Sequence, residues 1–216
     1  MTIRKFLHSC IVMEENGKRV LIDPGSFCFV ENKITPEDIG PVDVVLITHK
    51  HPDHYYPEAL KRIFALKPFT IITNREIGAM RSADGLTGEI ISAGDVKNVK
   101  GFEIRAYEGV HGRIPTEIPQ NLAYLINGKI LHPGDSLTVR GVPAHDILAL
   151  PITAPWLRLV DALEFAIVQK PKRVIPIHDA IMKDFMLERI YQMCHAALEK
   201  EGIGFQPLLL GEEIEV

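Results

Sequence analysis

The stretch VDVVLITHKHPDH, residues 42–54, joins an apolar run to a dense group of imidazole and carboxylate side chains. Residues 44–47 are all apolar, as expected for a strand that is buried on both faces of a sheet. Three of the nine histidines of the chain follow within six positions, together with an aspartate: His49, His51, Asp53 and His54. Because side chains alternate along an extended chain, His49 and His51 are expected on one side of it, with Asp53 next on that side.

This spacing suits metal binding. Imidazole nitrogens and carboxylate oxygens are the ligands that zinc and similar divalent ions prefer. His49 and His51 can therefore bind one ion, and Asp53 with His54 can help to bind a second. The alternative, a solvated polar turn at the end of a strand, explains a lone histidine better than it explains four ligand-type residues at fixed spacing. Since one loop cannot complete two sites, more ligands are expected from other strand ends.

Three candidates follow apolar runs elsewhere in the chain. His111 comes after FEIRAYEGV, Asp135 after GKILHPG, and His178 after KRVIPI. Each is expected at the carboxyl end of a strand, where α/β proteins gather their binding and catalytic residues. The sequence therefore predicts that these three side chains meet the 49–54 loop.

Two hairpins are predicted from Asn-Gly pairs, which tolerate the positive φ angles of a type I′ turn. Asn16-Gly17 is expected to join strands near 3–13 and 18–23, and Asn127-Gly128 to join a second pair. VMEENGKRVLIDPG and AYLINGKILHPG share one order: strand, Asn-Gly-Lys, strand, Pro-Gly. This likeness hints that the two halves of the chain repeat one architecture.

The remaining elements alternate between strands and helices. Buried strands are expected at 42–49, 69–73, 146–152 and 172–178, and others near 89–91, 96–99 and 102–109. Helices are expected after Pro57, after the N-cap residue Asn74, and over 157–170 and 183–200, and the tail is expected to form a closing hairpin or edge strand. This order predicts an α/β protein with sheets packed between helices.

Composition limits the function classes. The 216 residues suffice for one large domain or two small halves around one core, and a net charge of −4 without a basic run argues against nucleic-acid binding. Cys10, Cys28 and Cys194 are too far apart for a disulfide framework, so reduced thiols and a cytoplasmic location are expected. The N-terminus makes a poor signal peptide, and no apolar run approaches the length of a membrane span.

The histidine cluster also resembles a known family. HKHPDH matches the HxHxDH signature of the metallo-β-lactamase superfamily, and His111, GDS at 134–136 and PIH at 176–178 fall in that family's order. The resemblance implies an αββα sandwich: one domain over 1–216, with related halves near 1–100 and 101–216. The opening, LHSCIVMEENGKRVLIDPG, looks like that of a branch of small metal-dependent hydrolases akin to ascorbate-6-phosphate lactonases.

The resemblance implies a ligand set for two ions, with Asp135 as the bridge. His49, His51 and His111 would hold the first ion, and the second would be held by Asp53, His54 and His178. The cofactors would be two divalent ions, zinc first, with manganese, iron and nickel as alternatives. They would share a hydroxide for hydrolysis, which Asp53 would orient as the catalytic residue.

Substrate recognition is the least determined part of the sequence. Arg113, Arg140 and Arg158 lie near ligand-bearing loops and suit a small anionic ester, lactone or phosphodiester, unless they simply face solvent. His8 is a candidate for contact with the substrate or with a ligand carboxylate. Trp156, the single tryptophan, either walls the pocket or caps the core. A small-molecule substrate is expected, with neither nucleic acid nor membrane as a partner.

Three other functions compete with hydrolysis of a small molecule. A nuclease relative would be expected to carry an added domain or a basic surface. A diiron redox relative would have glutamate in place of His51, although a mononuclear iron site stays open. A metal-binding sensor without turnover would be expected to lack some of the seven ligands.

Overall fold

The computed structural model describes residues 1–216 and contains two mixed sheets of seven strands each. The first sheet has the strand order β14-β1-β2-β3-β4-β5-β6. Its strands, in chain order, are β1 (Thr2–Lys5), β2 (Ile11–Glu15), β3 (Lys18–Ile22), β4 (Val44–Ile47), β5 (Thr70–Thr73), β6 (Gly88–Ile90) and β14 (Glu213–Glu215). From β14 to β3 the pairing is antiparallel, and from β3 to β6 it is parallel.

The second sheet has the order β13-β12-β11-β10-β9-β8-β7. Its strands are β7 (Val96–Val99), β8 (Phe102–Glu108), β9 (Leu122–Ile126), β10 (Ile130–His132), β11 (Ile147–Pro151), β12 (Arg173–Ile177) and β13 (Gly204–Phe205). Pairing is antiparallel from β7 to β10 and parallel from β10 to β13, so both sheets follow one pattern.

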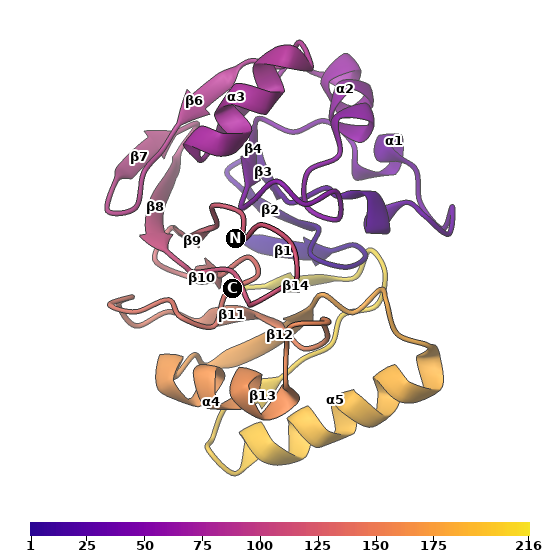
Figure 1. Cartoon of the computed structure of the whole chain (residues 1–216), viewed down its shortest axis with the longest axis vertical. Coiled ribbons are helices and arrows are strands. Elements are labelled where there is room, and N and C mark those ends of the chain that lie inside the picture. Colours follow the sequence, from indigo (N-terminus) through magenta and orange to yellow (C-terminus); the bar gives the residue numbers. More distant parts are fainter.

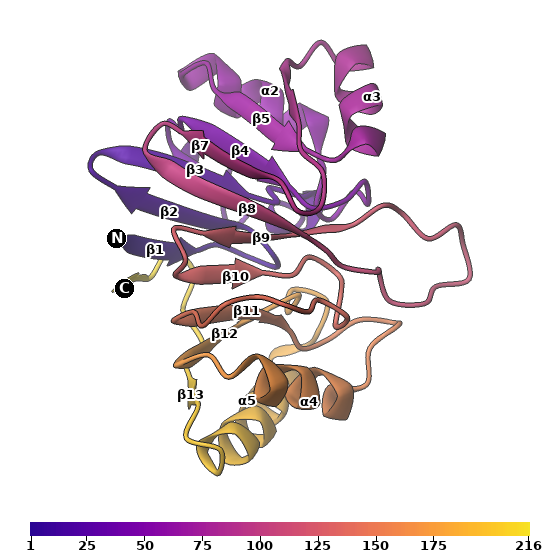
Figure 2. The ribbon, with the colours of Figure 1, turned by 90° about the vertical axis from the view of Figure 1, so that its left-hand side faces the viewer.

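Helices cover the outer face of each sheet (Figures 1 and 2). The first sheet carries the short η1 (Ser26–Cys28) and α1 (Pro36–Ile39), with α2 (Pro57–Leu66) and α3 (Arg75–Ala83). The second carries α4 (Leu159–Gln169) and α5 (Asp184–Glu199). The four layers confirm the expected αββα sandwich. No helix has both the length and the hydrophobicity to cross a lipid bilayer.

Three apolar clusters hold these layers together. The largest lies between the sheets and joins side chains of the first, such as Met13 and Leu46, to those of the second, such as Phe102 and Tyr124. A second cluster packs the first sheet against α2, and a third packs the other sheet against α4 and α5. Burial on both faces explains why β4, β9 and β11 are apolar throughout.

The predicted hairpin turns and helix starts are confirmed. Asn16 and Gly17 have φ angles of 52° and 69°, and Asn127 and Gly128 have 50° and 65°. These positive angles belong to the type I′ turn, which follows the twist of the flanking strands. Asn74 caps α3, since its side chain accepts a hydrogen bond from the backbone N–H of Ile77.

The single strand expected over 3–13 is wrong. The chain turns back at residues 6–10, so that β1 and β2 form an antiparallel pair of their own. His8 adopts a φ of 59°, and the backbone N–H of Phe6 bonds to the carbonyl of Cys10 at 2.9 Å. A histidine in this left-handed conformation has no signature in an apolar sequence pattern. The turn carries His8 to the end of the sheets where the histidine cluster lies.

The chain's tail also differs from a closing hairpin. β13 and β14 lie at the edges of different sheets, where β13 pairs with β12 and β14 pairs with β1. The alternative expectation, an edge strand, is therefore the one confirmed. The short helices η1 and α1 were not predicted, because neither is long enough to show a helical period.

Candidate metal centre

The candidate ligands lie just beyond the ends of strands from both sheets. In the first sheet, β4 leads directly into the loop of residues 48–55. In the second sheet, β8, β10 and β12 lead to His111, Asp135 and His178. An isolated bridge between His111 and Ser136 joins two of these loops. The fold therefore brings all seven predicted ligands to one end of the sandwich, although they span residues 49–178 of the chain.

The ligand atoms form two sets, in each of which they lie within 4.8 Å of one another. The first set consists of His49, His51, His111 and Asp135, and the second of His8, Asp53, His54 and His178. Nε2 of His49 lies 3.1 Å from Nδ1 of His51, and the ring centroids of His51 and His111 are 4.7 Å apart. Two histidine–carboxylate sets side by side match the donor chemistry of a dinuclear centre.

Asp135 lies between the two sets. Its Oδ1 is 3.1 Å from Nε2 of His54, and its Oδ2 is 3.1 Å from Nε2 of His178 and 3.5 Å from Nε2 of His111. The side chain is only 3% exposed. One carboxylate therefore reaches ligand nitrogens of both sets, which is the position that a bridging ligand needs.

Hydrogen bonds on the outer side of three histidines orient their rings. Nδ1 of His54 lies 2.7 Å from Oδ2 of Asp23, Nδ1 of His178 lies 2.5 Å from the carbonyl of Thr153, and Nδ1 of His111 lies 2.6 Å from the carbonyl of Gly112. Each partner only accepts hydrogen bonds, so each Nδ1 carries the proton. This leaves the Nε2 lone pairs free for a metal ion.

The atoms that face the centre lie close to one another but form no hydrogen bond. Nε2 of His54, His111 and His178 and Oδ1 of Asp135 are all buried without one. Burying polar atoms without partners is costly, and native proteins keep few of them. Four such atoms converging at one place fit cations that would bind there. The residues present therefore suit two divalent ions.

Asp23 supports both ligand sets from one position behind the 49–54 loop. It accepts hydrogen bonds from the backbone N–H of Thr48 at 2.8 Å and from the Thr48 hydroxyl at 2.7 Å, as well as from His54. The Thr48 hydroxyl in turn lies 3.0 Å from Nδ1 of His49 and accepts its proton. Asp23 thus orients one histidine of each set.

Replacing Asp23 with asparagine is expected to weaken metal binding by about 10–100-fold, because the amide cannot accept all three hydrogen bonds. Competition with a chromophoric chelator measures this affinity. Asp95→Asn, in an exposed loop where Asp95 caps the backbone N–H of Ser92, is the matched control and should retain the wild-type affinity. Equal affinities in the two variants would contradict the orienting role.

Charges at the centre favour ionised aspartates and protonated His54 and His178 when no metal is bound, whereas burial lowers the pKa of His8, His49 and His51. Burial alone would raise the pKa of Asp135, but His178 and His54 hold that pKa well below its ordinary value. Burial likewise opposes ionisation of Asp53, yet the nearby His178 and the hydrogen bond with His8 keep its pKa well below the usual range. Burial lowers the pKa of His178, but Asp135 and Asp53 outweigh it and raise the pKa to about 9.

The raised pKa of His178 predicts proton release on metal binding. Below its ordinary pKa of 6.5 this proton is bound in folded and unfolded chains alike, and its interactions stabilise the metal-free fold. That contribution is lost as the pH rises through about 9. A metal ion must displace the proton, so calorimetry in buffers of different ionisation enthalpy should show more proton release near about pH 7 than near about pH 9.5. Equal release at both values would contradict this assignment.

Of the residues predicted to bind substrate, the structure places His8 at the centre and the arginines away from the cavity. His8 is buried in the second ligand set, with Nε2 3.1 Å from Oδ2 of Asp53. Arg113 is exposed, and Arg158 is exposed and forms an ion pair with Asp161. Arg140 donates to the backbone carbonyls of residues 137 and 139. None of the three arginines lines the cavity above the centre, whereas Trp156 does.

Several supporting residues had not been predicted. Asn121 donates to the carbonyls of Gly109 and Pro133 and accepts from the backbone N–H of Asp135 at 3.1 Å, so it ties two ligand loops together. Gly25 touches the ligand loop so closely that a Cβ there would lie 1.8 Å from the carbonyl oxygen of Asp53. Such contacts join residues far apart in the chain, so a local sequence pattern does not reveal them. Only Gly25 lies in a recognisable local pattern, the DPG turn.

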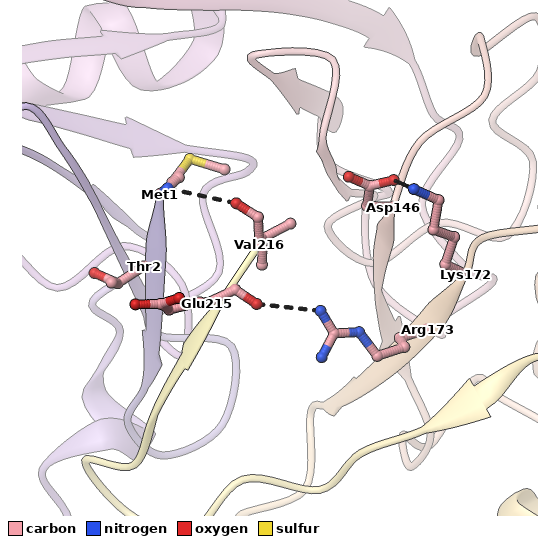
Figure 3. A pocket seen from close by; sticks show the side chains of 7 residues that line it. All are labelled: Met1, Thr2, Asp146, Lys172, Arg173, Glu215 and Val216. Atoms are coloured by element: carbon pink, nitrogen blue, oxygen red, sulfur yellow. Dashed lines mark hydrogen bonds and ion pairs between the residues drawn. The ribbon is translucent and has the colours of Figure 1, made fainter.

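Two cavities lie at opposite ends of β12. One, of about 580 Å³, opens above the metal centre and includes His178, which follows the strand. The other, of about 470 Å³, includes Arg173, which begins the strand, and the two chain ends (Figure 3). Arg173 and His178 are five positions apart along the chain, which in a strand corresponds to about 16 Å. No candidate ligand lines the second cavity, so the chemistry belongs to the first.

Comparison with known proteins agrees with this geometry. Residues 2–178 match the family described as Beta-lactamase superfamily domain. The protein Rv0786c of Mycobacterium tuberculosis is 33% identical over 192 residues, which cover 84% of this chain and 85% of that protein. The UPF0173 protein PF0020 of Pyrococcus furiosus is 30% identical over 190 residues, covering 79% and 80%.

Two further matches have names that mention metal-dependent hydrolysis. A UPF0173 metal-dependent hydrolase of Desulforamulus reducens is 28% identical over 190 residues, covering 79% of this chain and 81% of that protein. The structure of Igni18, a metallo hydrolase of Ignicoccus hospitalis, superimposes with a TM-score of 0.78 at 22% identity over the whole of both chains. With the family match and the sequence identities, the fold and paired ligand sets lead to one conclusion: the chain belongs to the metallo-β-lactamase superfamily and, within it, to the UPF0173 metal-dependent hydrolases.

Proposed function

We propose that the protein is an enzyme that uses two divalent ions to hydrolyse a small ester, lactone or phosphodiester. The observation that carries this proposal is the pair of adjacent ligand sets, which share Asp135 and open into one cavity. When bound, two such ions lower the pKa of water toward about 7 and polarise the substrate oxygen. The relatives named as metal-dependent hydrolases support the same chemistry.

The chain's own carboxylates have different positions in this reaction. Both line the cavity, but Asp135 is only 3% exposed and contacts histidines of both sets, whereas Asp53 is 17% exposed. Because its pKa stays well below the usual range, Asp53 is ionised at neutral pH and can orient an attacking water by accepting a hydrogen bond from it. His8 holds this carboxylate in place through a contact of 3.1 Å between its Nε2 and Oδ2 of Asp53.

Several finer assignments belong to the same proposal. Zinc is the proposed metal because it suits histidine and carboxylate ligands, with manganese, iron and nickel as alternatives. A cytoplasmic location is proposed from the three buried free cysteines. A relationship to ascorbate-6-phosphate lactonases is also proposed, and it rests only on the opening sequence LHSCIVMEENGKRVLIDPG. The anionic character of the substrate stays a prediction. The arginines from which it was predicted, Arg113, Arg140 and Arg158, do not line the cavity.

A substrate panel with controlled metal content tests the function. The natively purified protein should contain close to two equivalents of metal per chain by elemental analysis and should cleave at least one ester, lactone or phosphodiester. Chelation should abolish this turnover, and added Zn²⁺ should restore it. Asp53→Ala should lose metal and turnover together. Equal turnover with and without metal, or turnover in a one-electron redox assay alone, would contradict the proposal.

A further inference from the structure

The cavity above the metal centre has a polar floor and uncharged walls. Its floor consists of five candidate ligands: His51, Asp53, His111, Asp135 and His178. Its walls consist of seven other side chains, none of which carries a charge: Phe27, Ile114, Pro115, Thr116, Pro155, Trp156 and Ile181. With about 580 Å³, the cavity has the size of a small-molecule site.

The cationic side chains near the centre face solvent or pair with carboxylates, and none of them lines the cavity. Arg113 is exposed and lies outside the lining, although its neighbour Ile114 belongs to the wall. Arg158 pairs with Asp161, and Lys50 pairs with Glu76 at 2.7 Å. A carboxylate or phosphate on the part of a substrate remote from the ions would therefore lie against apolar walls, where an unpaired charge is costly.

Trp156 is held rigidly as one wall. Its Nε1 donates to Oδ2 of Asp135 at 3.1 Å, and its ring lies 5.7 Å from that of His111. The indole packs so closely on Gly112 that a Cβ there would lie 2.1 Å from Cε3. Phe27 is placed beside the other ligand set, with its ring centroid 5.2 Å from that of His8. Each ligand set thus has an aromatic side chain next to it.

We propose that the substrate carries an uncharged, apolar group on the side of the scissile bond remote from the ions, and that Trp156, Phe27 and Ile181 select it. This inference rests on the proposed hydrolase function, because the ions must hold the reacting ester or lactone. Bound ions would stabilise negative charge that develops at the reacting oxygen, whereas the walls offer only dispersion and apolar burial to the rest of the molecule.

Two esters with the same scissile bond test the wall chemistry. Methyl cyclohexylacetate is uncharged, and methyl (trans-4-carboxycyclohexyl)acetate carries a carboxylate remote from the ester. With Zn²⁺-loaded protein, kcat/KM should be about tenfold or more higher for the uncharged ester. Equal values, or preference for the carboxylate, would overturn the inference.

A wall variant sharpens this comparison. Ile181 is 41% exposed, so Ile181→Lys adds a cation to the wall without disturbing the core, and it should shift the preference toward the carboxylate ester. Val168→Lys is the matched control, because Val168 is 60% exposed on α4 and does not line the cavity. It should keep the wild-type preference. The same shift in both variants, or in neither, would count against selection by the walls.

A binding measurement separates this inference from the proposed function. Trp156 is the only tryptophan, so its fluorescence reports occupancy of the cavity even when no ester is cleaved. In a titration with the corresponding amides, the uncharged amide should bind with a dissociation constant about tenfold lower than that of the carboxylate. If no ester is cleaved but the uncharged amide binds more tightly, the proposed function fails and the inference about the walls stands. Tighter or equal binding of the carboxylate, or no binding of either, overturns the inference.

Discussion

Asp135→Asn is expected to abolish turnover and to lower the metal content of the purified protein. The substitution preserves the shape of the side chain but removes the one negative charge that lies within 3.5 Å of nitrogens of both ligand sets. Metal ions contribute several kcal/mol of charge stabilisation to such reactions, and each 1.36 kcal/mol is worth a factor of ten. A loss in kcat/KM of at least about 10³-fold follows.

Elemental analysis and kinetics on the best substrate of the panel check this result together. Asp161→Asn is the matched control, because Asp161 lies on the surface of α4 and pairs only with Arg158. It should keep both metal content and turnover. Circular dichroism should show the native fold in both variants. If Asp135→Asn retained two ions and wild-type turnover, the shared carboxylate would not be a bridging ligand.

Much of this architecture could be predicted from local patterns. The apolar runs at β4, β5, β11 and β12 and the Asn-Gly turns have short-range causes, since burial on two faces and positive φ angles each restrict residue choice at the position itself. The helices after Pro57 and Asn74 begin where a proline and an N-cap residue indicate. The candidate ligands could be found because each follows such a strand.

The features that the sequence did not predict depend on contacts between distant parts of the chain. The break in the 3–13 segment arises from the left-handed conformation of His8, whose ring centroid lies 4.0 Å from that of His178. Asn121 and Thr153 bond to loops that are distant in sequence, and asparagine and threonine are common in loops without any such role. Likewise, the position of Arg113 beside a ligand predicted a substrate contact, whereas the structure places the side chain at the surface.

The second large effect is expected on stability, from a buried ion pair behind the metal centre. Nζ of Lys5 lies 2.8 Å from Oδ2 of Asp179, and the two side chains are 4% and 6% exposed. Tyr191 donates to the same carboxylate oxygen at 2.8 Å. Removing one partner of such a pair leaves an uncompensated charge in the interior, so Lys5→Met should lower the free energy of unfolding by about 3–5 kcal/mol.

The neighbouring residue provides the control on the same strand. Arg4 pairs with Glu213, but these side chains are 39% and 42% exposed, so Arg4→Met should cost less than about 1 kcal/mol. Urea denaturation of the metal-free proteins measures both values. A similar cost for the two variants would show that Lys5 and Asp179 interact no more strongly than a surface pair.

The same ion pair connects stability to the site. Asp179 directly follows His178, and the backbone N–H of His178 bonds to the carbonyl of His8 at 3.3 Å, so β1 and the loop after β12 are joined on both sides of this ligand. Lys5→Met should therefore weaken metal binding as well, whereas Lys5→Met combined with Asp179→Asn removes both charges and should recover part of the stability. If the double variant were no more stable than Lys5→Met alone, the buried charge would not be the cause of the loss.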